Sequence, residues 1–351
     1  MHLLKKTYLN LELYQAGKPG YPRFFTRDSI ISAILMKESI MLKNQLIFCG
    51  MRQGKEKNPL TGEEPGKIFH EYPGFTSGEL STEYNACDTT ALFLIGHYYY
   101  YEWTQDKKFL EENIDTIKKA IEYICLHVRE GIFYEDPLFS GAERFALKVT
   151  YWKDSEILCR KEGIPSYPVV YTLAHIQNMS GLRCAEKLIE NDNLKIIIES
   201  MKLSLRQLYN SNNKSFYLAI DKEGKIDGIT SDLLHSLFYL EKEDLNEEQI
   251  EGILFSSSSL ETPLGYRTMS SVYTMIDQYH SETVWPFEQA IINLGAKKFG
   301  LKKVEEVSSR IIRYLDSDPE YFKLVSGEFK KAGCDPQLWT IAAKEYFELS
   351  N

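Results

Sequence analysis

A short aromatic stretch, Tyr151-Trp152-Lys153-Asp154-Ser155, places one carboxyl group beside aromatic side chains. A carboxylic acid against aromatic rings is poorly hydrated, which raises its pKa and lets it hold a proton near neutral pH. A second candidate carboxyl, Glu328, follows Ser326-Gly327 far downstream. One protonated and one ionised carboxyl are the minimal apparatus for cleaving a glycosidic bond. These residues predict a glycoside hydrolase in which Asp154 and Glu328 are catalytic.

An Arg-Asp pair, Arg27 and Asp28, precedes an expected helix over residues 30–42. We expect both side chains to bind sugar hydroxyls, because a carboxylate accepts two hydrogen bonds at once. The alternative is that Asp28 caps the helix and Arg27 pairs with a surface acid. Both interpretations are open at this point.

Two further polar groups lie between this helix and the next one. His70 and Glu71 belong to a long loop over residues 54–84, where they line a substrate pocket or form a surface pair. Asp88 opens an apolar helix, either as its N-cap or as a ligand contact. None of these residues indicates a function alone.

A third group surrounds the expected start of a helix at Pro286, which suits a first helical position. That position makes Glu288 a first-turn capping residue. Glu282 lies outside the helix and competes with Glu328 for the role of base. Arg267, Tyr279-His280 and Trp285 complete this group of candidate binding residues.

The elements that must position these residues are helices. Residues 108–129 carry one apolar stripe among Lys and Glu, whereas residues 90–103 are apolar nearly all round. The same pairing of a buried and an amphipathic helix recurs in 169–179 with 194–208 and in 285–299 with 301–315. The pattern predicts an all-α fold of helical hairpins in a ring, with at most a small β-hairpin around residues 215–229. We expect a single domain over residues 1–351, with loops of one rim converging on a central funnel.

Composition narrows the functional class. The 351 residues include 43% hydrophobic and 26% charged residues, and the net charge is -9 with a pI near 5.5. An acidic chain argues against nucleic acid and anionic membranes as partners. Six scattered cysteines and an N-terminus without an apolar run predict reduced thiols and a cytoplasmic protein. No spacing indicates a metal or a cofactor, and the oligomeric state is not readable.

Several stretches, taken in order, resemble the amylo-α-1,6-glucosidase, or glycogen-debranching, type of six-hairpin glycosidases. The resemblance spans nearly the whole chain, and the joint order is more specific than any one motif. The matching stretches are 20–29, 65–71, 84–93, 152–155, 230–232, 265–270, 279–286 and 333–339.

This resemblance implies an (α/α)6 barrel that hydrolyses an α-linked gluco-oligosaccharide or a small α-glycoside with inversion. It puts Asp154 at the position of the general acid and Glu328 at that of the base, and it puts Arg27 and Asp28 at sugar-binding positions. Trp152, Trp285 and Trp339 are expected to wall the pocket. The full set expected to bind substrate is Arg27, Asp28, His70, Glu71, Asp88, Trp152, Lys153, Arg267, Tyr279, His280, Glu282, Trp285, Gln337 and Trp339.

Other activities stay open on the residues alone. A phosphorylase could use the same barrel with phosphate as nucleophile, and a degenerate relative could bind carbohydrate without cleaving it. Terpene cyclases and zinc-dependent lanthionine cyclases are also helical toroids, but the first need an aspartate-rich run and the second need Cys and His ligands at a suggestive spacing. Neither pattern is found in the sequence.

Overall fold

Helices form most of the regular structure in the computed structural model, which describes residues 1–157, 160–270 and 279–349. The helices α1, α3, α5, α9 and α11 are rich in buried residues, as expected of helices that are covered on most sides. By contrast, α4 and α6 each bury one stripe. The bounds are α1 Thr26–Met36, α2 Ser39–Met51, α3 Thr89–Thr104, α4 Lys107–His127, α5 Thr172–Leu188, α6 Asp192–Leu208, α7 Asp232–His235, α8 Glu247–Ser257, α9 Pro286–Phe299, α10 Lys302–Ser309 and α11 Leu338–Leu349.

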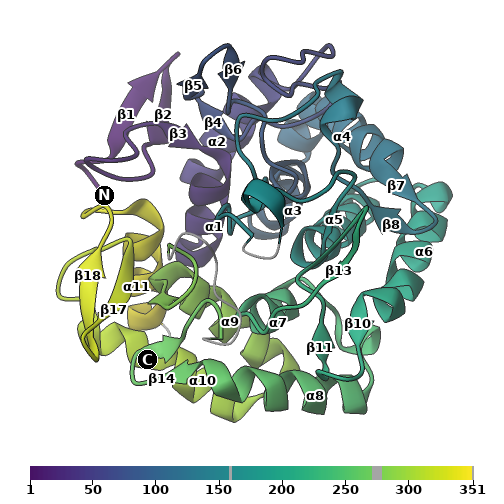
Figure 1. Cartoon of the computed structure of the whole chain (residues 1–351). Coiled ribbons are helices and arrows are strands. Elements are labelled where there is room, and N and C mark those ends of the chain that lie inside the picture. The colour runs from purple at the N-terminus through teal and green to yellow at the C-terminus, as the bar shows by residue number, and fades with distance from the viewer. Residues whose placement is uncertain (158–159, 271–278, 350–351) are drawn as a thin grey trace.

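The buried helices contact one another in a closed ring. In order, α1 packs on α3, α3 on α5, α5 on α7, α7 on α9, α9 on α11, and α11 again on α1. The helices α2, α4, α6, α8 and α10 each pack against the inner helix that they follow in the chain. The chain therefore travels once around the molecule, and the yellow C-terminal helix lies beside the purple N-terminal one (Figure 1).

The two ends of the ring are joined by backbone hydrogen bonds as well as by helix packing. Gly17 and Gln337 form an antiparallel bridge, and Leu338 N donates to Ala16 O at 2.7 Å. These bonds bring the stretch before α1 to the stretch before α11. Residues from both ends of the sequence can therefore share one site.

Short strands occupy the connections between helices. They form eight small sheets of two or three strands among the described residues, so the expectation of at most one β-hairpin is corrected. Strands of two to five residues carry no readable alternation. The strand bounds are β1 Lys5–Tyr8, β2 Leu11–Tyr14, β3 Phe24–Phe25, β4 Glu71–Tyr72, β5 Thr76–Ser77, β6 Leu80–Ser81, β7 Val128–Arg129, β8 Ile132–Phe133, β9 Val170–Tyr171, β10 Tyr209–Asn210, β11 Ser215–Phe216, β12 Ala219–Asp221, β13 Gly224–Ile226, β14 Glu261–Thr262, β15 Gly265–Tyr266, β16 Thr283–Val284, β17 Tyr321–Val325 and β18 Glu328–Ala332.

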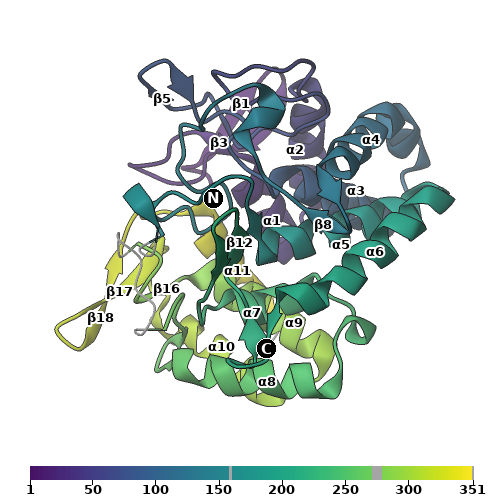
Figure 2. The same ribbon diagram turned by 45° about the vertical axis from the view of Figure 1, so that its right-hand side comes forward.

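One strand pair projects from the ring. β17 and β18 pair with Tyr321 opposite Ala332 and Val325 opposite Glu328, joined by Ser326 and Gly327 at φ 53° and 84°. Positive φ at both turn residues is the signature of a tight hairpin turn. The closed end of this hairpin points away from the body of the molecule (Figure 2).

A helix occurs in each segment where the sequence predicted one, but several bounds differ. The segment predicted over 301–315 is α-helical only to Ser309 and continues as a 3-10 helix over Arg310–Tyr314, and the segment predicted over 169–179 begins with β9 and is helical over Thr172–Leu188. The segment 30–42 was expected to be one helix, but α1 ends at Met36 because Lys37 adopts a left-handed conformation, φ 54°. α2 then begins at Ser39. No helix in the described part of the chain is both long enough and apolar enough to cross a membrane.

Candidate active site

A pocket opens where the two ends of the ring meet, and its walls come from the loops that precede α1, α3, α5, α9 and α11 and from the first turns of α1 and α11. The empty space of this pocket, counted together with its open mouth, is about 410 Å³. The lining residues are Ala16, Tyr21, Phe25, Arg27, Asp28, His70, Trp152, Asp154, Tyr279, His280, Trp285, Glu320, Gln337 and Trp339.

The aromatic walls are rigid and packed in series. Trp285 crosses Trp152 edge-on at 5.9 Å between ring centroids and crosses Trp339 in the same way at 5.6 Å. Trp339 in turn stacks on Phe287 at 4.1 Å. Edge-to-face and stacked rings of this kind hold their side chains in one arrangement. Such a wall can cover the apolar face of a sugar ring.

The predicted acid, Asp154, lies on this pocket with its side chain one-third exposed. Trp152 and His280 are its neighbours in the lining, and His280 Nδ1 is 3.9 Å from Asp154 Oδ1. Burial, reinforced by the cations Lys153 and Arg27, lowers the pKa of His280 well below its ordinary value. His280 is therefore neutral at neutral pH and does not form a true ion pair with Asp154.

A second carboxyl on the pocket is Glu320, which sequence reasoning missed. Its Oε2 accepts a hydrogen bond from Cys334 N at 2.8 Å, and its Oε1 accepts one from the Tyr279 hydroxyl. Burial raises the pKa of Glu320, while these two donors oppose the shift. Burial also raises the pKa of Tyr279 well above its ordinary value, so its hydroxyl stays protonated and keeps donating.

The positively charged side chain of the pocket is Arg27, which forms an ion pair with the carboxylate of Asp88. Arg27 Nε and Nη2 donate to the two oxygens of Asp88 at 2.8 and 2.9 Å, and both side chains are buried. Burial opposes the charge of Arg27, but Asp88 outweighs it, so the pKa of Arg27 is raised. Asp88 occupies the N-cap position of α3 without capping it, because its oxygens are directed to Arg27. Burial, then Arg27, lowers the pKa of His70 well below its usual range.

Asp28 is buried in the first turn of α1 and is not the cap of that helix. Burial raises its pKa to about 8; Arg27 opposes the shift, and Glu320 and Asp154 add to it. The amide of Gln337 lies 3.4 Å from Asp28 Oδ1. Its nitrogen donates to Ala16 O at 2.9 Å and its oxygen accepts from Trp339 Nε1 at 3.1 Å, which turns the oxygen toward Asp28. Both features favour a protonated, neutral Asp28.

Glu328, predicted as the base, lies outside this pocket. It is exposed at the first position of β18, opposite Val325 beside the hairpin turn. Its partner Val325 lies four positions along β17 from Tyr321, which is roughly 14 Å at about 3.4 Å per residue. Glu320 directly precedes β17, so the hairpin carries Glu328 outward from the position that Glu320 occupies.

Most of the other predicted binding residues line the pocket, and five do not. Glu71 is buried against Arg23, with Arg23 Nε 2.9 Å from its Oε2. Arg267 donates to Ser259 O at 2.9 Å and lies 3.7 Å from Glu282, whose side chain is 44% exposed. Asp88 acts behind Arg27. Lys153 is fully buried behind Trp152.

The lining residues that were not predicted are Ala16, Tyr21, Phe25 and Glu320. A sequence signal for Glu320 did exist. The run Val325-Ser326-Gly327-Glu328 has the form of a tight turn, which places Glu328 at a hairpin tip. An acid next to the aromatic Tyr321 at the opposite end of that hairpin is the better candidate for a buried carboxyl.

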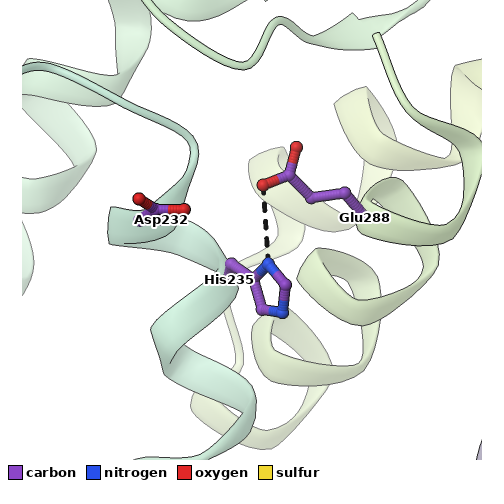
Figure 3. Close-up of side chains that lie close together, drawn as sticks. All are labelled: Asp232, His235 and Glu288. Atoms are coloured by element: carbon purple, nitrogen blue, oxygen red, sulfur yellow. Dashed lines mark ion pairs between the residues drawn. The ribbon is translucent and has the colours of Figure 1, made fainter. Parts of the chain in front are cut away.

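A cluster of possible metal ligands lies behind the pocket wall. Asp232, His235 and Glu288 each offer one ligand atom, and these three atoms lie within 4.8 Å of one another (Figure 3). His235 Nδ1 is 3.5 Å from Glu288 Oε1. The ammonium of Lys153 already approaches these carboxylates, 2.8 Å from Asp232 Oδ1 and 3.9 Å from Glu288 Oε1. A resident positive charge disfavours a metal ion at the same place.

No protein-family profile and no curated protein matches the sequence. The fold, however, is that of several carbohydrate-active enzymes of known structure. A GH63 mannosylglycerate hydrolase from Thermus thermophilus, solved with Tris and D-glycerate, superposes with a TM-score of 0.72 at 13% identity over 99% of this chain and 98% of its own. A cellobiose 2-epimerase from Bacillus thermoamylovorans gives 0.60 at 11% identity over 92% and 87% of the two chains. A GH78 rhamnosidase of a Bacillus species gives 0.61 at 13% identity, covering 94% of this chain and 32% of the larger enzyme.

Proposed function

We propose that this chain is an inverting glycoside hydrolase that acts on an α-linked gluco-oligosaccharide or a small α-glycoside, with Asp154 as general acid and Glu320 as general base. The observation that carries the proposal is that Asp154 and Glu320 lie on one pocket walled by Trp152, Trp285 and Trp339. The shared glycosidase-type fold supports the same class of reaction.

The two carboxyls have complementary tasks in this reaction. Asp154 gives its proton to the glycosidic oxygen of the leaving group, and ionised Glu320 removes a proton from the water that attacks the anomeric carbon from the opposite face. Inversion requires roughly 6.5–9.5 Å between the two carboxyls, which leaves room for that water. Tyr279 and Cys334 N orient Glu320 through its two oxygens. Glu320 is thus held in one direction before the substrate arrives.

The polar residues of the pocket are suited to a terminal sugar. Arg27 and Asp28 line the pocket from α1, and neutral His70 and His280 add groups that can donate or accept. One solved neighbour is a mannosylglycerate hydrolase that binds D-glycerate. Small glycosides of this kind therefore belong in the substrate screen beside malto-oligosaccharides and trehalose.

The carboxyls of the pocket favour hydrolysis over phosphorolysis. A phosphorylase must hold a phosphate dianion near the anomeric carbon, but Glu320 and Asp154 face this space while Arg27 is already paired with Asp88. Water as the nucleophile carries no such repulsion.

The proposal is tested by a screen of α-linked disaccharides and small α-glycosides, with NMR following the anomer first released. We expect the β-anomer from an α-glycoside, at a rate independent of added phosphate. Release of the α-anomer would exclude inversion. A sugar phosphate among the products would select the phosphorylase instead.

The roles of the two carboxyls are tested by Asp154→Asn and Glu320→Gln. A positioned acid or base contributes about 10²–10⁴-fold, so we expect kcat to fall by at least about 100-fold in each variant. Calorimetry with the sugar product should show that binding is retained. Glu328→Gln is the matched control, since Glu328 is exposed at the hairpin tip and its loss should leave kcat unchanged. An equal loss in Glu320→Gln and Glu328→Gln would disprove the assignment of the base.

A further inference from the structure

The lysine beside the proposed acid is buried in a cage of oxygens. Lys153 Nζ donates to Ser231 Oγ at 2.9 Å, to Asp232 Oδ1 at 2.8 Å and to Thr268 O at 3.0 Å. Its side chain has no exposed surface. Ser231 Oγ also donates to Glu288 Oε1 at 2.6 Å, which ties a fourth oxygen group into the cage.

One carboxylate of this cage receives hydrogen bonds from three consecutive residues. Besides Lys153, Trp152 Nε1 donates to Asp232 Oδ1 at 2.9 Å, and the Tyr151 hydroxyl is 3.3 Å from Asp232 Oδ2. These residues directly precede Asp154. Asp232 itself begins the short helix α7, which packs on α9 in the inner ring.

The residue after the acid is held by a different side chain. Ser155 Oγ and His280 Nδ1 are 2.7 Å apart, and His280 stacks on Trp285 with 5.0 Å between centroids. Asp154 therefore lies between two fixed neighbours, Lys153 on the ring helices and Ser155 on the pocket wall. A carboxyl on a loop gains its direction from contacts of this kind.

We propose that Asp232 is the positioning residue of the general acid, because it anchors the loop 151–155. In this anchor the ammonium of Lys153 lies between Asp232 and Glu288, in the place that a metal cation would take, so the anchor needs no metal. The inference rests on the proposed function, since it concerns the delivery of the proton by Asp154. We call Lys153, Ser231, Asp232 and Glu288 the acid-loop anchor. Its ammonium supplies positive charge to these oxygens without an ion from solution.

Removing one charge of a buried pair leaves the other unpaired, which can prevent folding by itself. The central variant is therefore Lys153→Met with Asp232→Asn, which removes one positive and one negative charge together. The matched control is Arg183→Met with Asp244→Asn. That pair is also largely buried, with Arg183 Nη2 2.7 Å from Asp244 Oδ1, but neither residue lines the pocket.

For the anchor variant we expect kcat to fall at least about tenfold with KM within about twofold of the wild type, because binding residues stay while the acid loses its direction. Amide exchange in the peptide covering residues 150–156 should become at least about tenfold faster. The control variant should lower the melting temperature without changing kcat or this exchange. An anchor variant with unchanged kcat and unchanged exchange would overturn the inference.

Two readouts separate this inference from the proposed function. If the wild type cleaves no glycoside, the proposed function fails, and the exchange of the 150–156 peptide still decides whether Asp232 fixes the loop. The metal-free character is checked on the wild type with EDTA and with Mn²⁺. We expect the melting temperature and activity to be unchanged, and a loss with EDTA that Mn²⁺ restores would overturn the role given to Lys153.

Discussion

Three carboxyl groups among the described residues line the pocket, and their surroundings differ in burial and hydrogen bonding. Burial raises the pKa of Glu320, but the hydrogen bonds that both of its oxygens accept oppose this shift and favour its ionised form. Asp28 faces an amide oxygen and is deeply buried, which favours its neutral form. Asp154 is one-third exposed and so can exchange its proton with solvent. Carboxyls with divergent environments allow one pocket to hold both a proton donor and a base.

The protonation of Asp28 gives a pH-dependent stability. Its pKa is raised from 3.8 to about 8, so the folded chain keeps a proton that the unfolded chain releases between these values. The stability from this group is full below about pH 4 and is lost as the pH rises through about 8. Asp28→Asn keeps a neutral side chain of similar shape. We expect its melting temperature to exceed that of the wild type at about pH 7.5, with a difference that shrinks toward pH 4.5.

The control for this comparison is Asp316→Asn, at an exposed residue paired with Lys331. Lys331 lowers the pKa of Asp316, so its small contribution has the opposite pH dependence. If the difference between Asp28→Asn and the wild type stays constant from pH 4.5 to 7.5, Asp28 is ionised in the folded chain.

For single residues, the sequence predicted which side chains line the pocket better than it predicted which side chains interact with each other. Arg27, Asp28 and Asp154 were found because each belongs to a motif with a local physical reason. Glu320 was missed because its burial depends on Tyr279 and Cys334, which are 41 and 14 positions away in the chain. The turn pattern at residues 325–328 indicates where the hairpin reverses, but it does not show that these two donors reach Glu320.

At the level of helices, the inner helices α3 and α5 approach each other closely because α5 carries a glycine at their contact. α3 and α5 meet at Gly181, where a Cβ would lie 2.9 Å from Ala91 Cα. Glycine lowers helix propensity by roughly 1 kcal/mol relative to alanine. Its presence in α5 is explained by this close packing rather than by local preference.

Substitution of glycine by alanine is expected to have opposite effects on stability at Gly181 and at Gly50. Gly181→Ala should lower the free energy of unfolding by about 1–3 kcal/mol, because the added methyl meets backbone atoms that have no room to move. Gly50→Ala in α2 meets its nearest atom at an ordinary 3.6 Å and should raise it by up to about 1 kcal/mol. Urea denaturation measures both. A stabilising Gly181→Ala would show that α3 and α5 are packed less tightly.

Helix periodicity in the sequence predicted most of the helices, but it did not predict where a helix is interrupted. Residues 107–127 were recognisable because their apolar stripe is sustained over many turns. The break between α1 and α2 was missed because Lys37 adopts a left-handed conformation without glycine or proline to indicate it. The strands of two residues, such as β3 and β4, are shorter than any readable period.

For the whole molecule, closure of the ring is the feature on which the pocket depends. α11 contacts both α1 and α9, and the stretch 335–338 hydrogen bonds to the stretch 16–18. Tyr21, Arg27 and Asp28 from one end therefore share the pocket with Gln337 and Trp339 from the other. The ring of helices was predicted from the alternation of buried and amphipathic helices, but the hydrogen bonds between the stretches 16–18 and 335–338 were not, because no local pattern pairs these two stretches.

We predict that deleting residues 338–351 abolishes folding, because α1 is buried along its whole length and would lose its largest partner. The full chain should unfold in one calorimetric transition, in keeping with a single domain over residues 1–351. Inserting a few residues between Gly78 and Glu79, at an exposed hairpin tip, is the control and should be tolerated. A folded deletion variant with native circular dichroism would contradict the role given to ring closure.

The bidentate pairing of Arg27 with Asp88 has a consequence for inhibition. Because Asp88 compensates the guanidinium, the electrostatic character of the cavity is left to Glu320 and Asp154. An iminosugar, whose ring nitrogen is protonated near neutral pH, would meet an ionised carboxylate there, whereas the parent sugar offers only hydroxyls. Cationic sugar mimics should thus be stronger competitors than neutral ones, and salts of anionic sugar acids should be weak.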